Sequence, residues 1–367
     1  MRSGAQALTG VAELLLPWFG ENARVLPWRS DPTPYHVWVS EIMLQQTRVE
    51  AVKSYYERFM SELPDIEALA YCPEDKLMKL WEGLGYYSRV RNLQKAALQI
   101  VEEMNGDVPD TREALLKLPG IGPYTSGAIA SIAFDRKVPA VDGNVLRVWS
   151  RLVGSRRNIS EPAVRKEIEA EILEVMPEKG AGAFNQGMME IGAMVCLPNG
   201  KPQCEVCPFA GICRARLEDL IDKIPVKDKK KDRRTEDRTV LIIRDGLHVL
   251  LHKRADKGLL AGLYELPNLD GHADEKAVLD WVKERGLLPV RIQDAGSGKH
   301  IFTHIEWHMK GYTVLVEDLD AYVRDEKEKY EPGTFLAANR KDAAEKYSIP
   351  SAFKTFARQI IPDMKQK

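Results

Sequence analysis

Apolar residues recur three or four positions apart through about residue 215 of the chain, which is the spacing of amphipathic helices. Turn signals such as Asp31-Pro32, Asn105-Gly106 and Asp142-Gly143 separate these stretches. The predicted helices cover 37–59, 73–105 with a break at 83–85, 112–116, 125–134 and 144–153. The pattern therefore predicts an all-helical first domain, with bounds at residues 1–222.

The pattern changes beyond residue 222. Residues 223–238 read KIPVKDKKKDRRTEDR, a charged run typical of a solvated linker, with contact to phosphate groups as the alternative. Farther on, apolar and polar positions alternate, and Asp245-Gly246 between two such runs predicts a type I′ hairpin. Strands are predicted at 239–244, 247–253 and 311–316, and helices at 275–285 and 351–361. We expect residues 239–367 to form a smaller α+β domain.

Composition is that of a folded protein: 44% of the 367 residues are hydrophobic and 29% are charged, which excludes wholesale disorder and fibrous folds. A net charge of −1 argues weakly against a nucleic-acid partner and excludes a polybasic chromatin-type protein. The apolar runs at 14–16 and 118–134 are too short for a signal peptide or a membrane span. We expect a soluble cytoplasmic protein.

Two carboxylates and a glycine turn are the candidate chemistry of the helical domain. Glu41 shares a helix face with apolar residues, which favours a raised pKa and proton donation, although a solvent-exposed glutamate is the plain alternative. Asp142 begins a helical pattern, as an N-cap does, and a helix N-terminus favours the ionised carboxylate. A carboxylic acid paired with a carboxylate suits cleavage of a glycosidic bond. Between them lies the turn LPGIG (118–122), where Gly120 and Gly122 leave backbone N–H groups free to bind an anion or simply join two helices.

Four of the five cysteines lie close together in the sequence, at Cys196, Cys204, Cys207 and Cys213. Four thiolates so close together indicate a metal site, either iron–sulfur or zinc, and the spacing alone does not decide between them. The isolated Cys72 is expected to be a buried core residue.

These motifs together resemble the endonuclease III superfamily of base-excision DNA glycosylases, and within it the adenine DNA glycosylases. The resemblance covers nearly the whole chain. It rests on LPWR (26–29), WVSEIMLQQTRV (38–49), WEGLGYYSRVRNL (81–93), LPGIGPYT (118–125), VDGNVLRV (141–148) and FNQGMMEIGAMVC (184–196). It implies a helix-hairpin-helix at about 112–134, a cluster loop at 196–213 and a Nudix-like second domain.

The resemblance assigns roles to the candidate catalytic residues. Glu41 is implied to protonate adenine at N7, and Asp142 to stabilise the oxocarbenium ion, with Tyr124 and Asn144 in support. Bifunctional relatives carry a Schiff-base lysine where this chain has Tyr124. A second amine position of some adenine glycosylases is Leu146 here. We therefore expect a monofunctional enzyme; the alternative is a glycosylase/lyase acting on oxidised pyrimidines.

The resemblance also implies the binding surfaces. Residues implied to line the adenine pocket are Trp28, Arg29, Gln186 and Glu190. Residues implied to fill the gap left by the flipped base and to contact the opposing 8-oxoguanine are Gln46, Thr47, Leu84 and Tyr86, together with the loop Phe302, Thr303 and His304. Thr303 replaces the serine usual in the family, and its β-branch restricts the rotamer of the hydroxyl.

The implied cofactor is a [4Fe–4S] cluster on Cys196, Cys204, Cys207 and Cys213, although seven residues rather than the usual six separate the first two cysteines. The stretch 276–286 contains a single glutamate, so we do not expect nucleotide hydrolysis by the Nudix-like domain. The implied partner is duplex DNA with adenine opposite 8-oxoguanine or guanine. The protein is expected to act as a monomer associated with a bacterial nucleoid and to have no membrane partner.

Overall fold

The computed structural model describes residues 10–228, 232–323 and 331–361, and the chain divides into two compact units. The first unit comprises Met1–Tyr71 and Arg91–Lys230, and the second comprises Cys72–Val90 and Lys231–Lys367. The segment Cys72–Val90, which we expected within the helical domain, thus clusters with the second unit. The expected domain bounds also take in residues 1–9, 229–231, 324–330 and 362–367, which lie outside the described residues.

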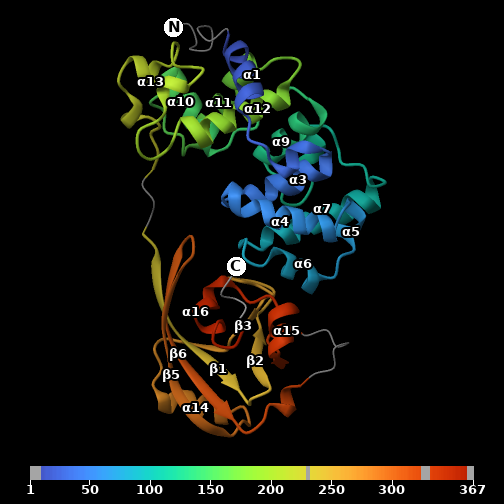
Figure 1. Ribbon diagram of the computed structural model, residues 1–367, viewed down its shortest axis with the longest axis vertical. Coiled ribbons are helices and arrows are strands. Elements are labelled where there is room, and N and C mark those ends of the chain that lie inside the picture. Colours follow the sequence, from blue (N-terminus) through green and yellow to red (C-terminus); the bar gives the residue numbers. More distant parts are fainter. Residues whose placement is uncertain (1–9, 229–231, 324–330, 362–367) are drawn as a thin grey trace. The chain divides into compact units, whose positions relative to one another are not determined.

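The first unit is helical (Figure 1). Its elements are α1 (Val11–Asn22), α2 (Pro27–Ser30), α3 (Pro34–Leu44), α4 (Val49–Glu62), α5 (Ile66–Ala70), α8 (Arg112–Leu115), α9 (Pro123–Phe134), α10 (Gly143–Val153), α11 (Pro162–Val175), α12 (Ala181–Glu190), η2 (Ile191–Val195), η3 (Cys204–Val206), α13 (Arg214–Leu217) and η4 (Ile221–Lys223). The element α7 (Ser88–Glu103) begins in the segment that clusters with the second unit. The helix predicted at 37–59 is two helices, because Gln46 adopts a left-handed backbone with φ 61°.

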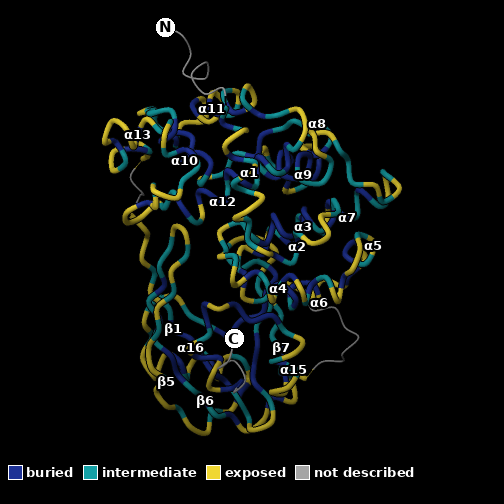
Figure 2. The backbone as a smooth tube through the Cα atoms, turned by 45° about the horizontal axis from the view of Figure 1, so that its top comes forward, coloured by how far each residue is buried: buried dark blue, intermediate teal, exposed yellow. Residues whose placement is uncertain are grey.

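Helix α9 lies in the interior of the first unit (Figure 2). Every residue of α9 from Thr125 to Ser131 is buried, and the helix contacts α3 and α12. At Gly127 the backbone of Pro139 comes so close that an added Cβ would overlap the Pro139 carbonyl oxygen. Glycine at this position therefore lets the segment before α10 lie directly on the helix backbone.

The second unit is built on a mixed sheet of order β3-β2-β1-β6-β5, with β4 paired to β1 and β7 paired to β2. The strands are β1 (Arg234–Arg244), β2 (His248–Lys253), β3 (Tyr264–Glu265), β4 (Asn268–Asp270), β5 (Pro289–Ile301), β6 (Ile305–Val316) and β7 (Phe335–Asn339). The strands β1 and β6 run parallel over eleven registered pairs, from Arg234↔Ile305 to Arg244↔Leu315. The pairing of β1 therefore begins inside the stretch 223–238 that we expected to be a linker.

Helices cover both faces of this sheet (Figure 1). The alternation along β1 places Val240 and Ile242 on the face covered by α15 (Arg340–Glu345), η6 (Ser351–Phe353) and α16 (Lys354–Ala357), whereas Leu241 and Ile243 face α14 (Glu275–Lys283). The remaining helices are α6 (Glu74–Trp81) and η5 (Asp320–Tyr322). The predicted α+β class and the helix at 275–285 agree with this layout.

Three local expectations differ from the structure. The turn at Asp245-Gly246 has positive φ only at Gly246 (134°), and the Asp245 carboxylate accepts from the N–H groups of Leu247 and His248, so an Asx turn replaces the type I′ turn. The strand β5 was not predicted, because its mostly exposed residues show no apolar alternation. The helix predicted at 351–361 is the short pair η6 and α16. None of the helices in the described part of the chain is long and apolar enough to span a membrane.

Candidate active site

One cavity of about 730 Å³ in the first unit gathers most of the predicted site residues. Its walls come mainly from α2, α3, α9, α10 and α12 and from the turns before α2, α4, α9 and α10, with single residues from α4, α11 and η2. The predicted residues that line it are Trp28, Arg29, Glu41, Gln46, Thr47, Gly120, Gly122, Tyr124, Asp142, Asn144, Gln186 and Glu190. Side chains from sequence positions more than 100 residues apart thus meet at one place.

Glu41 is buried on α3, with 6% of its surface exposed. The helix begins after Thr33, whose side chain accepts a hydrogen bond from the N–H of His36. Burial raises the pKa of Glu41 from 4.5 to about 7; the hydrogen bond from Tyr124 opposes the rise, and the nearby Asp142 carboxylate adds to it. The carboxyl group therefore holds a proton in an appreciable fraction of molecules near neutral pH.

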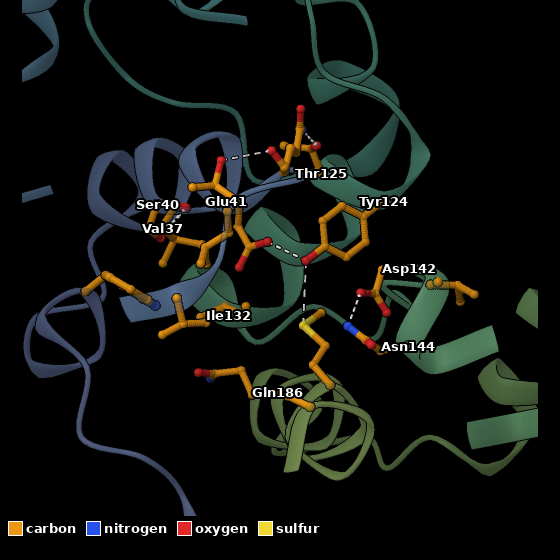
Figure 3. Close-up of a pocket in the computed structure, with 18 of the residues that line it drawn as sticks. Val37, Ser40, Glu41, Tyr124, Thr125, Ile132, Asp142, Asn144 and Gln186 are labelled. Atoms are coloured by element: carbon orange, nitrogen blue, oxygen red, sulfur yellow. Dashed lines mark hydrogen bonds between the residues drawn. The ribbon is translucent and has the colours of Figure 1, made fainter. Parts of the chain in front are cut away.

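Tyr124 points toward Glu41 from the first turn of α9 (Figure 3). Its hydroxyl donates to Glu41 Oε2 at 2.5 Å and also lies 3.6 Å from the sulfur of Met189. Burial and the two neighbouring carboxyl groups raise the pKa of Tyr124 well above its ordinary value, so the phenol remains a hydrogen-bond donor. The turn before α9 needs Gly120, which has φ 76°.

Asp142 is the N-cap of α10, as the sequence predicted. Its two carboxylate oxygens accept hydrogen bonds from the N–H of Val145 and from Asn144 Nδ2, both at 2.8 Å. These bonds lower the pKa of Asp142, but burial outweighs them and the pKa lies above its ordinary value. The expectation that the helix N-terminus favours the ionised carboxylate is therefore opposed by burial, while the two hydrogen bonds act in its favour.

Asn144 is held in turn by the buried Arg147, which the sequence analysis did not single out. Arg147 Nη2 donates to Asn144 Oδ1 at 2.9 Å and to the Gly192 carbonyl at 2.7 Å, while Nε donates to the Cys196 carbonyl at 2.9 Å. A chain of hydrogen bonds therefore connects the carboxylate of Asp142 to the backbone of the first clustered cysteine.

A second network in the cavity wall surrounds Glu190, a carboxylate with no exposed surface. Arg24 Nη2 lies 2.7 Å from Glu190 Oε2, and Arg29 binds the other carboxylate oxygen. Arg29 Nε also donates to Gln186 Oε1 at 2.9 Å. Arg24 was missed by the sequence analysis because a single arginine between two helices has no pattern that separates it from a surface residue. The network places polar groups in the cavity wall, and such groups can form hydrogen bonds to a bound heterocycle.

Of the residues implied to fill the gap or contact the opposing base, Leu84, Tyr86 and the loop 302–304 lie in the second unit. Tyr86 is 48% exposed with φ 47°, and its hydroxyl lies 2.8 Å from Thr303 Oγ1. Leu84, by contrast, is buried, and its carbonyl accepts from Arg89 Nη2 at 3.0 Å.

Thr303 belongs to the exposed turn between β5 and β6. His304 is also exposed there, whereas Phe302 packs between the rings of His300 and Trp307. The structure therefore places Tyr86, Thr303 and His304, but not Leu84, where a large partner can reach their side chains.

The four clustered cysteines, Cys196, Cys204, Cys207 and Cys213, surround a separate small cavity as free thiols. Within the described residues, no three His, Cys, Asp or Glu side chains are close enough to hold a single metal ion. Burial raises the pKa of Cys207 to about 12, and Arg151 Nη1 lies 3.3 Å from Cys196 Sγ. Four thiols around one cavity, next to a cation, are a donor set that fits a metal site of the iron–sulfur or zinc class.

Comparison with known proteins agrees with this geometry. Residues 39–174 match the model of the HhH-GPD superfamily base excision DNA repair proteins, and residues 239–359 match a NUDIX domain. The adenine DNA glycosylase of Mus musculus is 36% identical over 86% of this chain and 72% of its own length. That of Buchnera aphidicola subsp. Acyrthosiphon pisum is 32% identical over 87% and 90%. A solved thermostable thymine-DNA glycosylase superposes with a TM-score of 0.52 at 28% identity over 59% of this chain and 97% of its own.

The raised pKa of Glu41 makes stability depend on pH. Between 4.5 and about 7 the folded protein holds a proton that the unfolded chain has released, so stability falls as pH rises through this window. Glu41→Gln removes that ionisation and keeps an acceptor for Tyr124. Relative to wild type, we expect its free energy of unfolding to rise by up to about 3 kcal/mol between about pH 4.5 and about pH 8. Urea unfolding of the intact chain at several pH values measures this; a difference that stays constant with pH contradicts the assignment.

Proposed function

This chain belongs to the adenine DNA glycosylase family, and from that membership and its site we propose that it removes adenine from DNA by hydrolysing the N-glycosidic bond in base excision repair. The observation that carries the proposal is the meeting of Glu41, Tyr124 and Asp142 in one cavity, with Glu41 held at a pKa of about 7. A carboxyl group that can donate a proton and a second carboxylate beside it are the two groups that this hydrolysis requires.

The two carboxyl groups take different roles because their surroundings differ. Glu41 lies among apolar neighbours and is the proton donor to N7 of the leaving adenine. Asp142 accepts two hydrogen bonds and is the carboxylate that stabilises the cationic sugar. Tyr124 donates to Glu41 and orients its carboxyl group, and Asn144 does the same for Asp142.

The reaction is proposed to stop at base removal. Among the described residues that line the cavity there is no lysine, and Tyr124 stands where bifunctional relatives carry one. A Schiff base with the sugar needs an amine, so strand cleavage by the lyase route has no nucleophile here. A glycosylase/lyase acting on oxidised pyrimidines is therefore not favoured.

Adenine is proposed to be recognised by the network around Glu190 and Arg29, after extrusion from the duplex. Gln186 offers an acceptor for its exocyclic amine and Arg29 offers donors for its ring nitrogens, while the buried Glu190 holds Arg29 in place and Trp28 lines the pocket. Extrusion costs a few kcal/mol of stacking, which is smallest at a mispair.

The preferred substrate is proposed to be adenine opposite 8-oxoguanine or guanine, bound by a single copy of the chain. Gln46 and Thr47 line the cavity where the left-handed turn after α3 exposes them, and Tyr86, Thr303 and His304 are the exposed candidates for the opposing base. Gly120 and Gly122 present the N-terminus of α9 to a DNA phosphate. The Nudix-like unit is proposed to serve recognition through its exposed Thr303 and His304, and α14 carries one glutamate rather than the paired glutamates that would bind metal for hydrolysis.

The thiols of Cys196, Cys204, Cys207 and Cys213 are proposed to hold a [4Fe–4S] cluster. The longer gap between the first two cysteines is absorbed in a turn with Gly200 at φ 76°, closed by the bond from the N–H of Gln203 to the carbonyl of Val195. The cluster has no step in glycosidic hydrolysis, and it shapes the loop around it.

The cluster predicts a coloured protein. Iron and sulfide in a 1:1 ratio and a broad visible absorption band should accompany the purified chain, and Cys204→Ser should lose most of both. Metal analysis and absorption spectroscopy test this. A colourless protein that carries zinc, whose filled d shell gives no visible band, contradicts it.

A panel of duplexes tests the activity. A duplex with adenine opposite 8-oxoguanine should release free adenine and leave a strand that breaks only with alkali, whereas Asp142→Asn should lose about 10³-fold or more of the rate. The measurement is single-turnover base release followed by gel electrophoresis with and without alkali. Strand cleavage of a thymine glycol duplex without alkali would overturn the proposal in favour of the lyase.

A further inference from the structure

We propose that Asn185 is a positioning residue that fixes the segment leading to Asp142 and so sets where that carboxylate lies. The inference rests on the function proposed above for Asp142. Asn185 itself does not line the catalytic cavity, although its neighbour Gln186 does, so any effect on catalysis must pass through the segment it holds.

The side chain of Asn185 is buried on α12 with 2% of its surface exposed. Its Oδ1 accepts from the N–H of Ala140 at 3.0 Å, and its Nδ2 donates to the carbonyl of Val138 and to the hydroxyl of Ser131, both at 2.8 Å. The amide thus uses its acceptor and both donor hydrogens. Two of the three bonds go to the backbone of one short segment.

That segment, residues 135–142, joins α9 to α10 and belongs to no helix or strand. Its buried polar groups therefore need partners from elsewhere, and an unpaired buried N–H or C=O costs stability. Asn185 supplies the partner for both Val138 and Ala140, and the backbone of α9 at Gly127 supports Pro139 from the other side. The segment is held between α9 and α12 immediately before Asp142.

The consequence for catalysis is geometric. Ala140 has no exposed surface and lies two residues before Asp142, so a shift of its backbone carries over to the N-cap carboxylate. Catalytic groups must be held within about 0.5 Å of their productive position, and a displacement of about 1 Å can cost about 10²-fold in rate.

The test compares Asn185→Ala with Ser131→Ala. The second variant removes a bond to the same amide, but the other bonds of the Ser131 hydroxyl within the described part of the chain go to the carbonyls of Gly127 and Ala128 in α9. In single-turnover assays on a duplex with adenine opposite 8-oxoguanine, we expect Asn185→Ala to slow adenine release by about 10- to 100-fold and Ser131→Ala by less than about threefold. Duplex affinity should stay within about threefold of wild type in both variants. Equal losses of rate in the two variants would contradict the proposal.

A second arm separates positioning from general loss of stability. In an Asp142→Asn background, Asn185→Ala should lower the residual rate by less than about threefold, because the group it positions is already gone. A further loss as large as in the wild-type background would assign Asn185 a merely structural role. Asn185→Gln, which keeps the amide's acceptor and both donor hydrogens on a longer side chain, should retain more of the rate than Asn185→Ala and is the variant to use if the alanine does not fold. A rate at or below that of Asn185→Ala contradicts the proposal.

A third readout does not depend on activity. Hydrogen exchange of the Ala140 amide should be faster in Asn185→Ala and unchanged in Ser131→Ala. Failure of wild type to release adenine would refute the proposed function. Unchanged exchange at Ala140 in Asn185→Ala would refute the claim that Asn185 holds the segment 135–142.

Discussion

Burial of one carboxyl group, that of Glu41, is the constraint on which the rest of the site depends. In water this group is ionised at neutral pH and cannot act as an acid, and the fold removes enough water to bring its pKa to about 7. The buried helices α3 and α9 enclose it, and Tyr124 donates the hydrogen bond that gives the buried group a partner. The ionised form costs stability, which is the usual consequence of preparing a group for proton transfer.

Charged groups that are buried away from water each need a hydrogen-bonding or ionic partner. Glu190 lies between Arg24 and Arg29, and Asp142 accepts from Asn144 and from the backbone of α10. In both cases the partner is fixed by a further hydrogen bond rather than left to solvent. Such networks fix geometry, and removing any single member costs stability because it leaves a buried polar group unpaired.

The sequence was most informative where local chemistry determines local structure. The start of α9 after its glycine turn and Asp142 as the cap of α10 both follow from residues close in the chain. The break between α3 and α4 depends on one left-handed residue, Gln46, which the apolar pattern does not mark. Arg24 and Arg147 owe their roles to groups far away in the sequence, so no spacing rule could identify them. The raised pKa of Asp142 likewise arises from tertiary burial, which the capping pattern does not report.

The central claim is that Glu41 acts as a buried acid held by Tyr124, and the pH dependence of single-turnover adenine release tests it most directly. The rate should fall about tenfold per pH unit above an apparent pKa near 7, because the acid form of Glu41 is lost. In Tyr124→Phe the hydrogen bond that lowers this pKa is gone, so the descending limb should move to higher pH. A rate that stays level between about pH 6 and about pH 9, or a limb that moves to lower pH in Tyr124→Phe, would contradict the account.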